Sequence, residues 1–182
     1  TAAFQAVPEL QGLLNQTKRM GPATHSALSR ALLDFSNQLL PYLTEERYAG
    51  RLIYGGGDDV LAYSNLWEWD QWLMDVCRCF RGGKDPKGQF INQGDYWRWN
   101  PEKGKLPERI SARPLFTMGR KATISFGIVV ANQAVPLAIA LENLWEAEAE
   151  AKAEAAMEQA KKVSLAGGLM ATSNTVQETQ DS

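Results

Sequence analysis

The stretch RLIYGGGDDVLAY, residues 51–63, places three glycines and two adjacent aspartates between two short apolar runs. Short apolar runs bounded by turn residues are typical of two strands joined by a hairpin. A hairpin turn needs only one or two permissive residues, so the neighbouring carboxylates require a separate explanation. Two carboxylates a few ångströms apart repel each other unless a cation lies between them.

A divalent cation explains the pair. Mg²⁺ prefers hard oxygen ligands and typically binds one or two carboxylates together with substrate phosphates. We therefore expect Asp58 and Asp59 to bind Mg²⁺ or Mn²⁺ and to be catalytic, while Gly56 and Gly57 let a nucleotide approach the main chain. The apolar flanks predict buried strands that hold the turn on a rigid frame. An exposed hairpin, in which Gly and Asp are both common, is the alternative.

Helical periodicity on both sides of the hairpin predicts two helices. One begins at Thr24 and is limited by Pro41, and the other begins near Asn65 and reaches Phe80. The segment 81–108, rich in Gly, Lys and Asn, is interpreted as a long loop. Two helices flanking two strands give the order helix, strand, strand, helix.

The second half of the chain continues this order with one strand and one helix. Residues 121–132, KATISFGIVVAN, are β-branched and almost continuously apolar, which predicts a central strand. A helix is expected from about Leu137 to about Lys162. With one more strand in front, the order would be that of a ferredoxin-like split β-α-β unit.

The fold class is therefore predicted to be α/β (α+β), ferredoxin-like, without a segment for its first strand. Residues 1–23 are interpreted as an N-terminal linker, residues 24–162 as the partial domain, and residues 163–182 as a disordered tail. The missing initiator Met indicates a piece of a longer chain.

Composition excludes several classes of protein. The 182 residues contain no apolar run of about 18 residues, and the N-terminus does not resemble a signal peptide, so no membrane association is expected. Cys77 and Cys79 are interpreted as ordinary reduced thiols, compatible with a cytoplasmic location. The only histidine is His25, which excludes a hydrolase of the HD or zinc type within this chain.

Two features leave a nucleic-acid contact open. Residues 102–121 carry six basic and two acidic side chains, which fits either phosphate binding or a solvated loop. The stretch DYWRWNP, residues 95–101, interleaves aromatic rings with Arg98. These rings would either pack in a folded loop or stack on bases.

Two long blocks resemble a known family, the large subunit of type III CRISPR effector complexes of the III-B (Cmr-type) branch. The block HSALSRALLDFSNQLLPYLTEERYAGRLIYGGGDDVLAYSNLWEWDQWL, from residue 25, is similar to the core of its second palm domain. The block ATISFGIVVANQAVPLAIALENLWEAEAEAK, residues 122–152, is similar to the later strand and helix. The chain departs from the family in lacking an earlier D-G-D segment and in having Asn132 where a histidine is expected.

The resemblance implies a palm that joins ATP into cyclic oligoadenylate second messengers when a guide RNA (crRNA) recognises target RNA. It implies other effector subunits as partners, and crRNA and target RNA through the complex. In addition to Gly56, Gly57, Asp58 and Asp59, called here the GGDD residues, we expect phosphate contacts from three others: Arg120, Lys121 and Ser125. Whether this chain is itself an enzyme stays open, because an inactive palm that scaffolds the complex fits the same residues. A stand-alone diguanylate-type cyclase is a third alternative.

Overall fold

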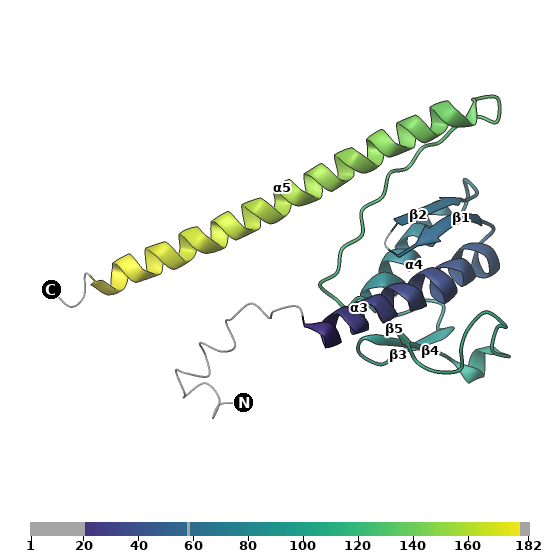
Figure 1. Ribbon diagram of the computed structural model, residues 1–182, viewed down its shortest axis with the longest axis horizontal. Coiled ribbons are helices and arrows are strands. Elements are labelled where there is room, and N and C mark those ends of the chain that lie inside the picture. The colour runs from purple at the N-terminus through teal and green to yellow at the C-terminus, as the bar shows by residue number, and fades with distance from the viewer. Residues whose placement is uncertain (1–20, 58, 179–182) are drawn as a thin grey trace. The chain divides into compact units, whose positions relative to one another are not determined.

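The computed structural model describes residues 21–57 and 59–178, and the chain forms two compact units with their boundary between Thr123 and Ile124 (Figure 1). The first unit contains helices and two small antiparallel sheets, whereas the second contains an extended segment and one long helix. The α+β class expected from the sequence is confirmed. The predicted linker, residues 1–23, lies almost entirely outside the described residues.

The first helix passes through the proline that was expected to end it. Helix α3 (Pro22–Asp34) continues through the π-helical turns η1 (Phe35–Leu39) and η2 (Tyr42–Arg47). The N–H of Leu40 bonds to the carbonyl five residues earlier, which widens the backbone. A wider turn relieves the clash between a proline ring and the carbonyl four residues before it. Pro41 therefore has helical backbone angles, and the prediction that it ends the helix is wrong.

The predicted pair of strands is confirmed. β1 (Arg51–Gly56) and β2 (Asp59–Tyr63) form a two-stranded antiparallel sheet. The register shifts between Leu52 and Tyr54, so one extra residue of β1 bulges out of the ladder.

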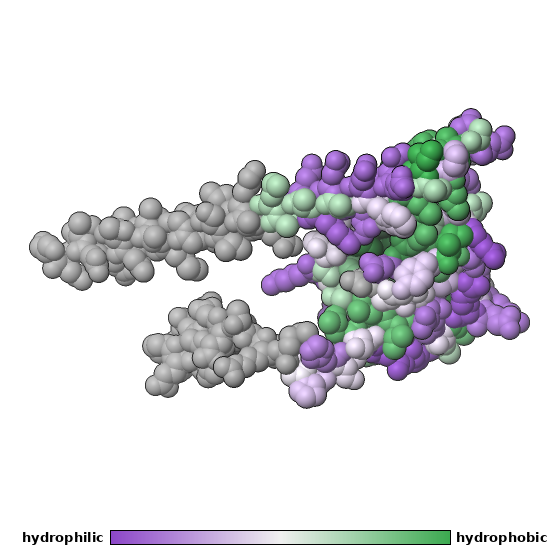
Figure 2. Space-filling model, turned by 45° about the horizontal axis from the view of Figure 1, so that its top comes forward, coloured by the Kyte–Doolittle hydropathy of each residue, from purple (hydrophilic) through white to green (hydrophobic). Residues whose placement is uncertain are grey.

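The hairpin is not buried as expected. Ile53, Tyr54 and Tyr63 are each more than half exposed. Figure 2 shows hydrophobic surface among the hydrophilic side chains of the face it draws. The expectation that the strands on both sides of the turn are buried is wrong, because every residue of β1 and β2 is half-buried or exposed.

Helix α4 spans Trp69–Arg81, starting four residues after the predicted Asn65. Its inner face carries Trp72, Val76 and Phe80. The helix ends at Gly82, whose φ of +68° is the left-handed conformation that favours glycine at a helix C-terminus.

The predicted loop 81–108 contains structure that its composition does not indicate. It carries β3 (Phe90–Asn92), β4 (Tyr96–Trp99) and the 3₁₀ turn η3 (Pro101–Lys103). Together with β5 (Leu115–Phe116) the strands form a three-stranded antiparallel sheet in the order β3-β4-β5. The prediction of a long loop is wrong, because strands of two to four residues are too short to give a periodic signal.

The core of the first unit lies between the first helix, α4 and the three-stranded sheet. Its aliphatic part comes mainly from the helix, and its aromatic part joins the helix to the sheet. The largest wholly or almost wholly buried side chains are Phe35, Leu39, Leu40, Leu43, Val76, Trp97 and Leu115. Tyr42 meets Phe90 and Trp99 edge-on, at ring-centroid distances of 5.5 and 5.7 Å.

The second unit does not contain the strand predicted at residues 121–132. The segment is extended but pairs with no strand among the described residues. Gly127 lies against the backbone of Leu144 and Glu148 in helix α5 (Leu137–Glu178), so closely that a Cβ would collide with it. A pattern of β-branched residues indicates an extended backbone but not a partner, and here the extended chain packs on a helix.

Helix α5 also continues past its predicted end near Lys162. It reaches Glu178, so the disorder predicted for residues 163–182 is wrong for residues 163–178. Residues 163–178 contain no proline, so every residue there can donate its backbone N–H to a helix. Residues 179–182 lie outside the described residues.

Candidate functional site

The GGDD residues form a tight turn at the tip of the hairpin. Gly56 pairs with Asp59, which leaves only Gly57 and Asp58 between the strands. Gly57 has a φ of +67°, as the first central residue of a primed two-residue turn requires. Asp58 itself lies outside the described residues, so its predicted role stays a prediction.

Each of the three positions 55–57 requires glycine for a different physical reason. A side chain at Gly55 would press on Leu40 of the first helix, at 3.3 Å from a Cβ. At Gly56 a Cβ would collide with the ring of Tyr54. Gly57 supplies the positive φ, and nothing lies within 4 Å of where its Cβ would be. The turn therefore rests on the helix on one side and leaves open space beside its tip.

Asp59 is exposed and starts β2 beside this open space. Among the described residues its carboxylate receives no hydrogen bond and forms no ion pair, so it is free to bind a cation. A carboxylate without a basic neighbour suits Mg²⁺ or Mn²⁺, which prefer hard oxygen donors. In the described part of the chain, no group of three His, Cys, Asp or Glu side chains could hold a metal. Asp58 does not belong to that part.

The basic candidates lie after β5. Arg120 and Lys121 are exposed, and the carbonyl of Arg120 accepts hydrogen bonds from the Arg81 guanidinium at 3.2 and 3.4 Å. Over residues 21–57 and 59–178, no hydrogen bond or ion pair joins either side chain to the hairpin. Ser125 is half-buried in the second unit and is not on a strand. Phosphate binding by these residues stays a prediction.

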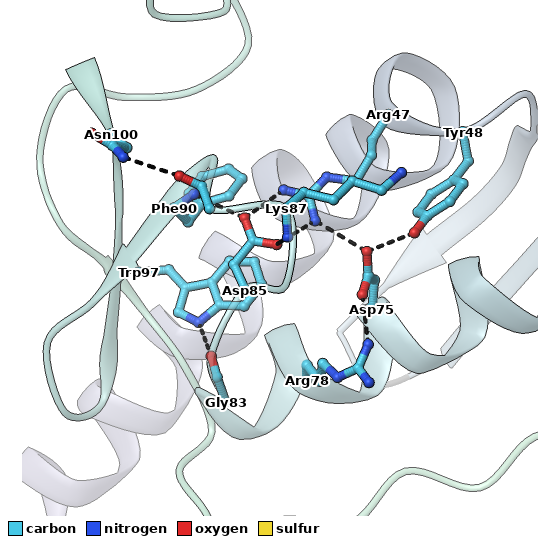
Figure 3. A network of polar contacts seen from close by, with 11 residues as sticks. Arg47, Tyr48, Asp75, Arg78, Gly83, Asp85, Lys87, Phe90, Trp97 and Asn100 are labelled. Carbon is cyan, nitrogen blue, oxygen red and sulfur yellow. Dashed lines mark hydrogen bonds and ion pairs between the residues drawn. The ribbon is translucent and has the colours of Figure 1, made fainter. Parts of the chain in front are cut away.

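Below the hairpin lies a buried charge network that the sequence analysis missed (Figure 3). Arg47, at the end of η2, has a side chain that is only 1% exposed. Its guanidinium donates two parallel hydrogen bonds to Asp85, at 2.9 and 2.8 Å, and a third to Asp75 at 3.2 Å. Burial lowers the pKa of Arg47, but the Asp85 and Asp75 carboxylates more than compensate and raise it.

The same network includes the next residue of the chain. The Tyr48 hydroxyl donates to Asp75 at 2.6 Å, and Arg78 donates to the other oxygen of that carboxylate at 2.9 Å. Burial, followed by the hydrogen bond to Asp75, raises the pKa of Tyr48. The Lys87 ammonium lies 3.9 Å from the Tyr48 ring centroid. Because β1 starts three residues after Tyr48, the network fixes the base of the hairpin that carries the GGDD turn.

No local signal in the sequence points to this network. Its main charges, at positions 47, 75 and 85, come from η2, α4 and the loop between α4 and β3. Only the fold brings them together, and each has the appearance of an ordinary surface charge in the sequence.

The sequence model described as Cas10/Cmr2, second palm domain, matches residues 7–90. These residues belong to that family. The matched palm segment contains the first helix, the GGDD hairpin and α4. Over these residues the match supports a Cas10/Cmr2 palm fragment, the domain type found in the large subunit of type III CRISPR effectors. The resemblance of residues 122–152 lies outside the match and stays a prediction.

No curated protein and no solved structure matches the chain. Among residues 21–57 and 59–178, no helix of the palm segment or of the rest of the chain has the length and apolar character needed to cross a membrane.

Proposed function

We propose that the palm segment forms the nucleotidyltransferase site of a type III effector and joins ATP into cyclic oligoadenylates in the cytoplasm during antiviral defence. The observation that carries the proposal is the turn itself. It presents Asp59 as an exposed carboxylate, without a partner among the described residues, beside open space at Gly57. The hairpin rests on the first helix through Gly55 and is fixed at its base by the Arg47 network.

In this proposal Asp58 and Asp59 hold Mg²⁺ or Mn²⁺. The bound cations would activate the attacking 3′-hydroxyl and stabilise the leaving pyrophosphate. Gly56 and Gly57 contribute by leaving room for a triphosphate to approach the backbone. Arg120, Lys121 and Ser125 would contact phosphates if the segment after β5 comes to the turn in the assembled complex.

A second candidate is an inactive palm that scaffolds the crRNA-guided complex. It is favoured by one observation on the described residues: residues 121–132 do not join the hairpin sheet. The two candidates differ in whether the turn binds a metal–nucleotide complex.

Calorimetric titration of the purified chain with ATP and Mn²⁺ separates them. We expect binding by the native chain and none by the Asp58→Asn/Asp59→Asn double variant. Asp70→Asn removes an exposed carboxylate from α4 and is the matched control, which should bind as the native chain does. Equal binding by the double variant would exclude the GGDD turn as the site. No binding by any form would favour the scaffold. In the assembled effector, chromatography of the products formed from ATP then tests for cyclic oligoadenylates.

A further inference from the structure

The register of the three-stranded sheet sorts its side chains onto two faces. Phe90 lies opposite Trp99, and Trp97 lies opposite Leu115, and all four side chains are buried. This inner face packs in the core, where the rings of Phe90 and Trp97 stack at 5.0 Å. The two tryptophans of DYWRWNP are therefore core residues, as the packed-loop alternative holds.

The outer face is formed by the residues between them. Ile91 lies opposite Arg98, and Tyr96 lies opposite Phe116. Ile91 and Tyr96 are 40% and 38% exposed. The rings of Tyr96 and Phe116 lie 4.8 Å apart and are tilted by 57°, so they form one small aromatic surface. The outer face is defined here as these four residues.

Arg98 stands two residues from Tyr96 on the same strand and thus on the same side of the sheet. It is exposed, and within the described ranges it makes no hydrogen bond or ion pair. This differs from other arginines of the first unit, because Arg47, Arg109 and Arg113 all pair with carboxylates. The outer face therefore combines the exposed ring of Tyr96, the half-buried ring of Phe116 and a positive charge without an acidic partner among the described residues.

We propose that the outer face is a stacking platform for single-stranded nucleic acid. Every base has a flat π-face, so an exposed aromatic pair accepts bases without regard to sequence. A guanidinium beside the rings can contact the phosphate backbone or lie over a base. Lys103 and Lys105, exposed in the chain that leaves β4, add positive charge without acidic partners among the described residues.

The size of the outer face favours a nucleic-acid strand over a protein as its partner. The three strands contain three, four and two residues, and only every second one faces outward. A specific protein interface typically buries about 800 Å² on each partner, which these few side chains cannot supply. One or two stacked bases need only the aromatic pair and its flanking arginine.

Fluorescence anisotropy with the full chain and labelled 12-nucleotide oligo-A and oligo-U tests the proposal. We expect Tyr96→Ala and Arg98→Ala each to weaken binding about tenfold, as loss of one stacking or cationic contact predicts. Tyr96→Phe keeps the ring and should bind as the native chain does. Arg51→Ala, which removes an exposed arginine from the other sheet, is the charge-matched control.

A thermal melt of each variant checks that the fold is retained. Tyr96→Phe also separates loss of stacking from loss of structure. DNA of the same sequence should bind as well, because the base faces are alike, whereas a duplex, whose bases are hidden, should bind less tightly. Three results would overturn the proposal. The first is that the native chain binds no oligonucleotide, even if it self-associates. The others are that Tyr96→Ala binds as tightly as the native chain, or that duplex binds as tightly as single strands.

The test is independent of the function proposed for the GGDD turn. The Asp58→Asn/Asp59→Asn variant should bind oligonucleotides as the native chain does. Failure of the turn to bind ATP therefore leaves this inference standing, and the reverse also holds.

Discussion

The guanidinium of Arg47 and the carboxylate of Asp85 face each other through two parallel hydrogen bonds of 2.9 and 2.8 Å. Their side chains are only 1% and 0% exposed. Asp85 also accepts hydrogen bonds from the backbone N–H groups of Lys87 and Phe90, at 3.1 and 2.9 Å. The pair thus joins the end of the first helix to the loop that leads into the three-stranded sheet.

Replacing Arg47 by methionine should strongly destabilise the first unit. Arg47→Met keeps the aliphatic volume but leaves the buried Asp85 carboxylate without a cation and Asp75 with Arg78 alone. Breaking a buried pair in this way typically costs about 3–5 kcal/mol. Urea unfolding followed by tryptophan fluorescence measures the loss. Arg78→Met removes an arginine that is 40% exposed from the same network and should cost less than about 1 kcal/mol. Similar losses for both variants would contradict the assigned difference.

The hydroxyl of Tyr48 should contribute to stability in a pH-dependent way. Tyr48→Phe removes the donor to Asp75 and should cost about 2 kcal/mol near neutral pH. The folded state raises the pKa of Tyr48, so its contribution is complete below the ordinary value of 10.0 and declines as pH rises above it. The native chain should lose stability above pH 10 more steeply than Tyr48→Phe. Tyr63→Phe, at an exposed position, is the control, and parallel curves for all three would refute this role.

Asp34 should make the stability of the first unit depend on pH in the acidic range, opposite to Tyr48. Burial raises the pKa of Asp34, but hydrogen bonds from Arg113 and from the N–H of Phe116 outweigh it and lower the pKa below 3.8. Its contribution is therefore complete above the unfolded value and is lost as pH falls through the lower folded value. Arg113→Met should cost about 2 kcal/mol at pH 7 and reduce the acid dependence below about pH 4. Arg30→Met removes a more exposed partner at 3.5 Å and should change both quantities less.

The turn glycine can be tested by its backbone conformation. Gly57→Ala places a side chain at a φ of +67° and should destabilise the hairpin by about 1–2 kcal/mol. Gly57→Asn should cost less, because asparagine tolerates this conformation. Chemical shifts of β1 and β2 report the population of the hairpin directly. Equal effects of Ala and Asn would show that the positive φ is not what selects glycine.

The two free cysteines should differ in reactivity. Cys79 is buried and Cys77 is half-buried, and burial raises the pKa of both thiols. Only the thiolate reacts readily with iodoacetamide, so modification should be slow for both and slowest for Cys79. Mass spectrometry of timed samples distinguishes the sites. Faster modification of Cys79 than of Cys77 would contradict the burial of α4 against the core.

The parts of the fold that could be predicted are those with a strong local pattern. Helix α4 follows from apolar periodicity, and the hairpin follows from two short apolar runs around Gly55 to Asp59. Pro41 misled because its helix widens into π turns, which no propensity scale includes. Residues 121–132 misled because β-branched composition does not say which surface an extended chain will pack against.

The candidate site shows the same limit. The turn that carries Asp59 is encoded by neighbouring residues and was found from them. The Arg47 network depends on carboxylates 28 and 38 positions away, and such pairings arise only when the chain has folded. The outer face of the three-stranded sheet needed the strand register, which decides that Tyr96 and Arg98 face out while Trp97 faces in.

The sharing of Arg47 between two carboxylates also sets what can be cut away from this molecule. Residues 82–118 have the position of an insertion after α4, which a shortened version of the domain would replace by a short linker. Excision would remove Asp85 and the aromatic partners of Tyr42, so the buried Arg47 guanidinium would keep only its 3.2 Å contact with Asp75. The hairpin and the three-stranded sheet therefore depend on the same arginine, and a minimal version of this domain has to keep both.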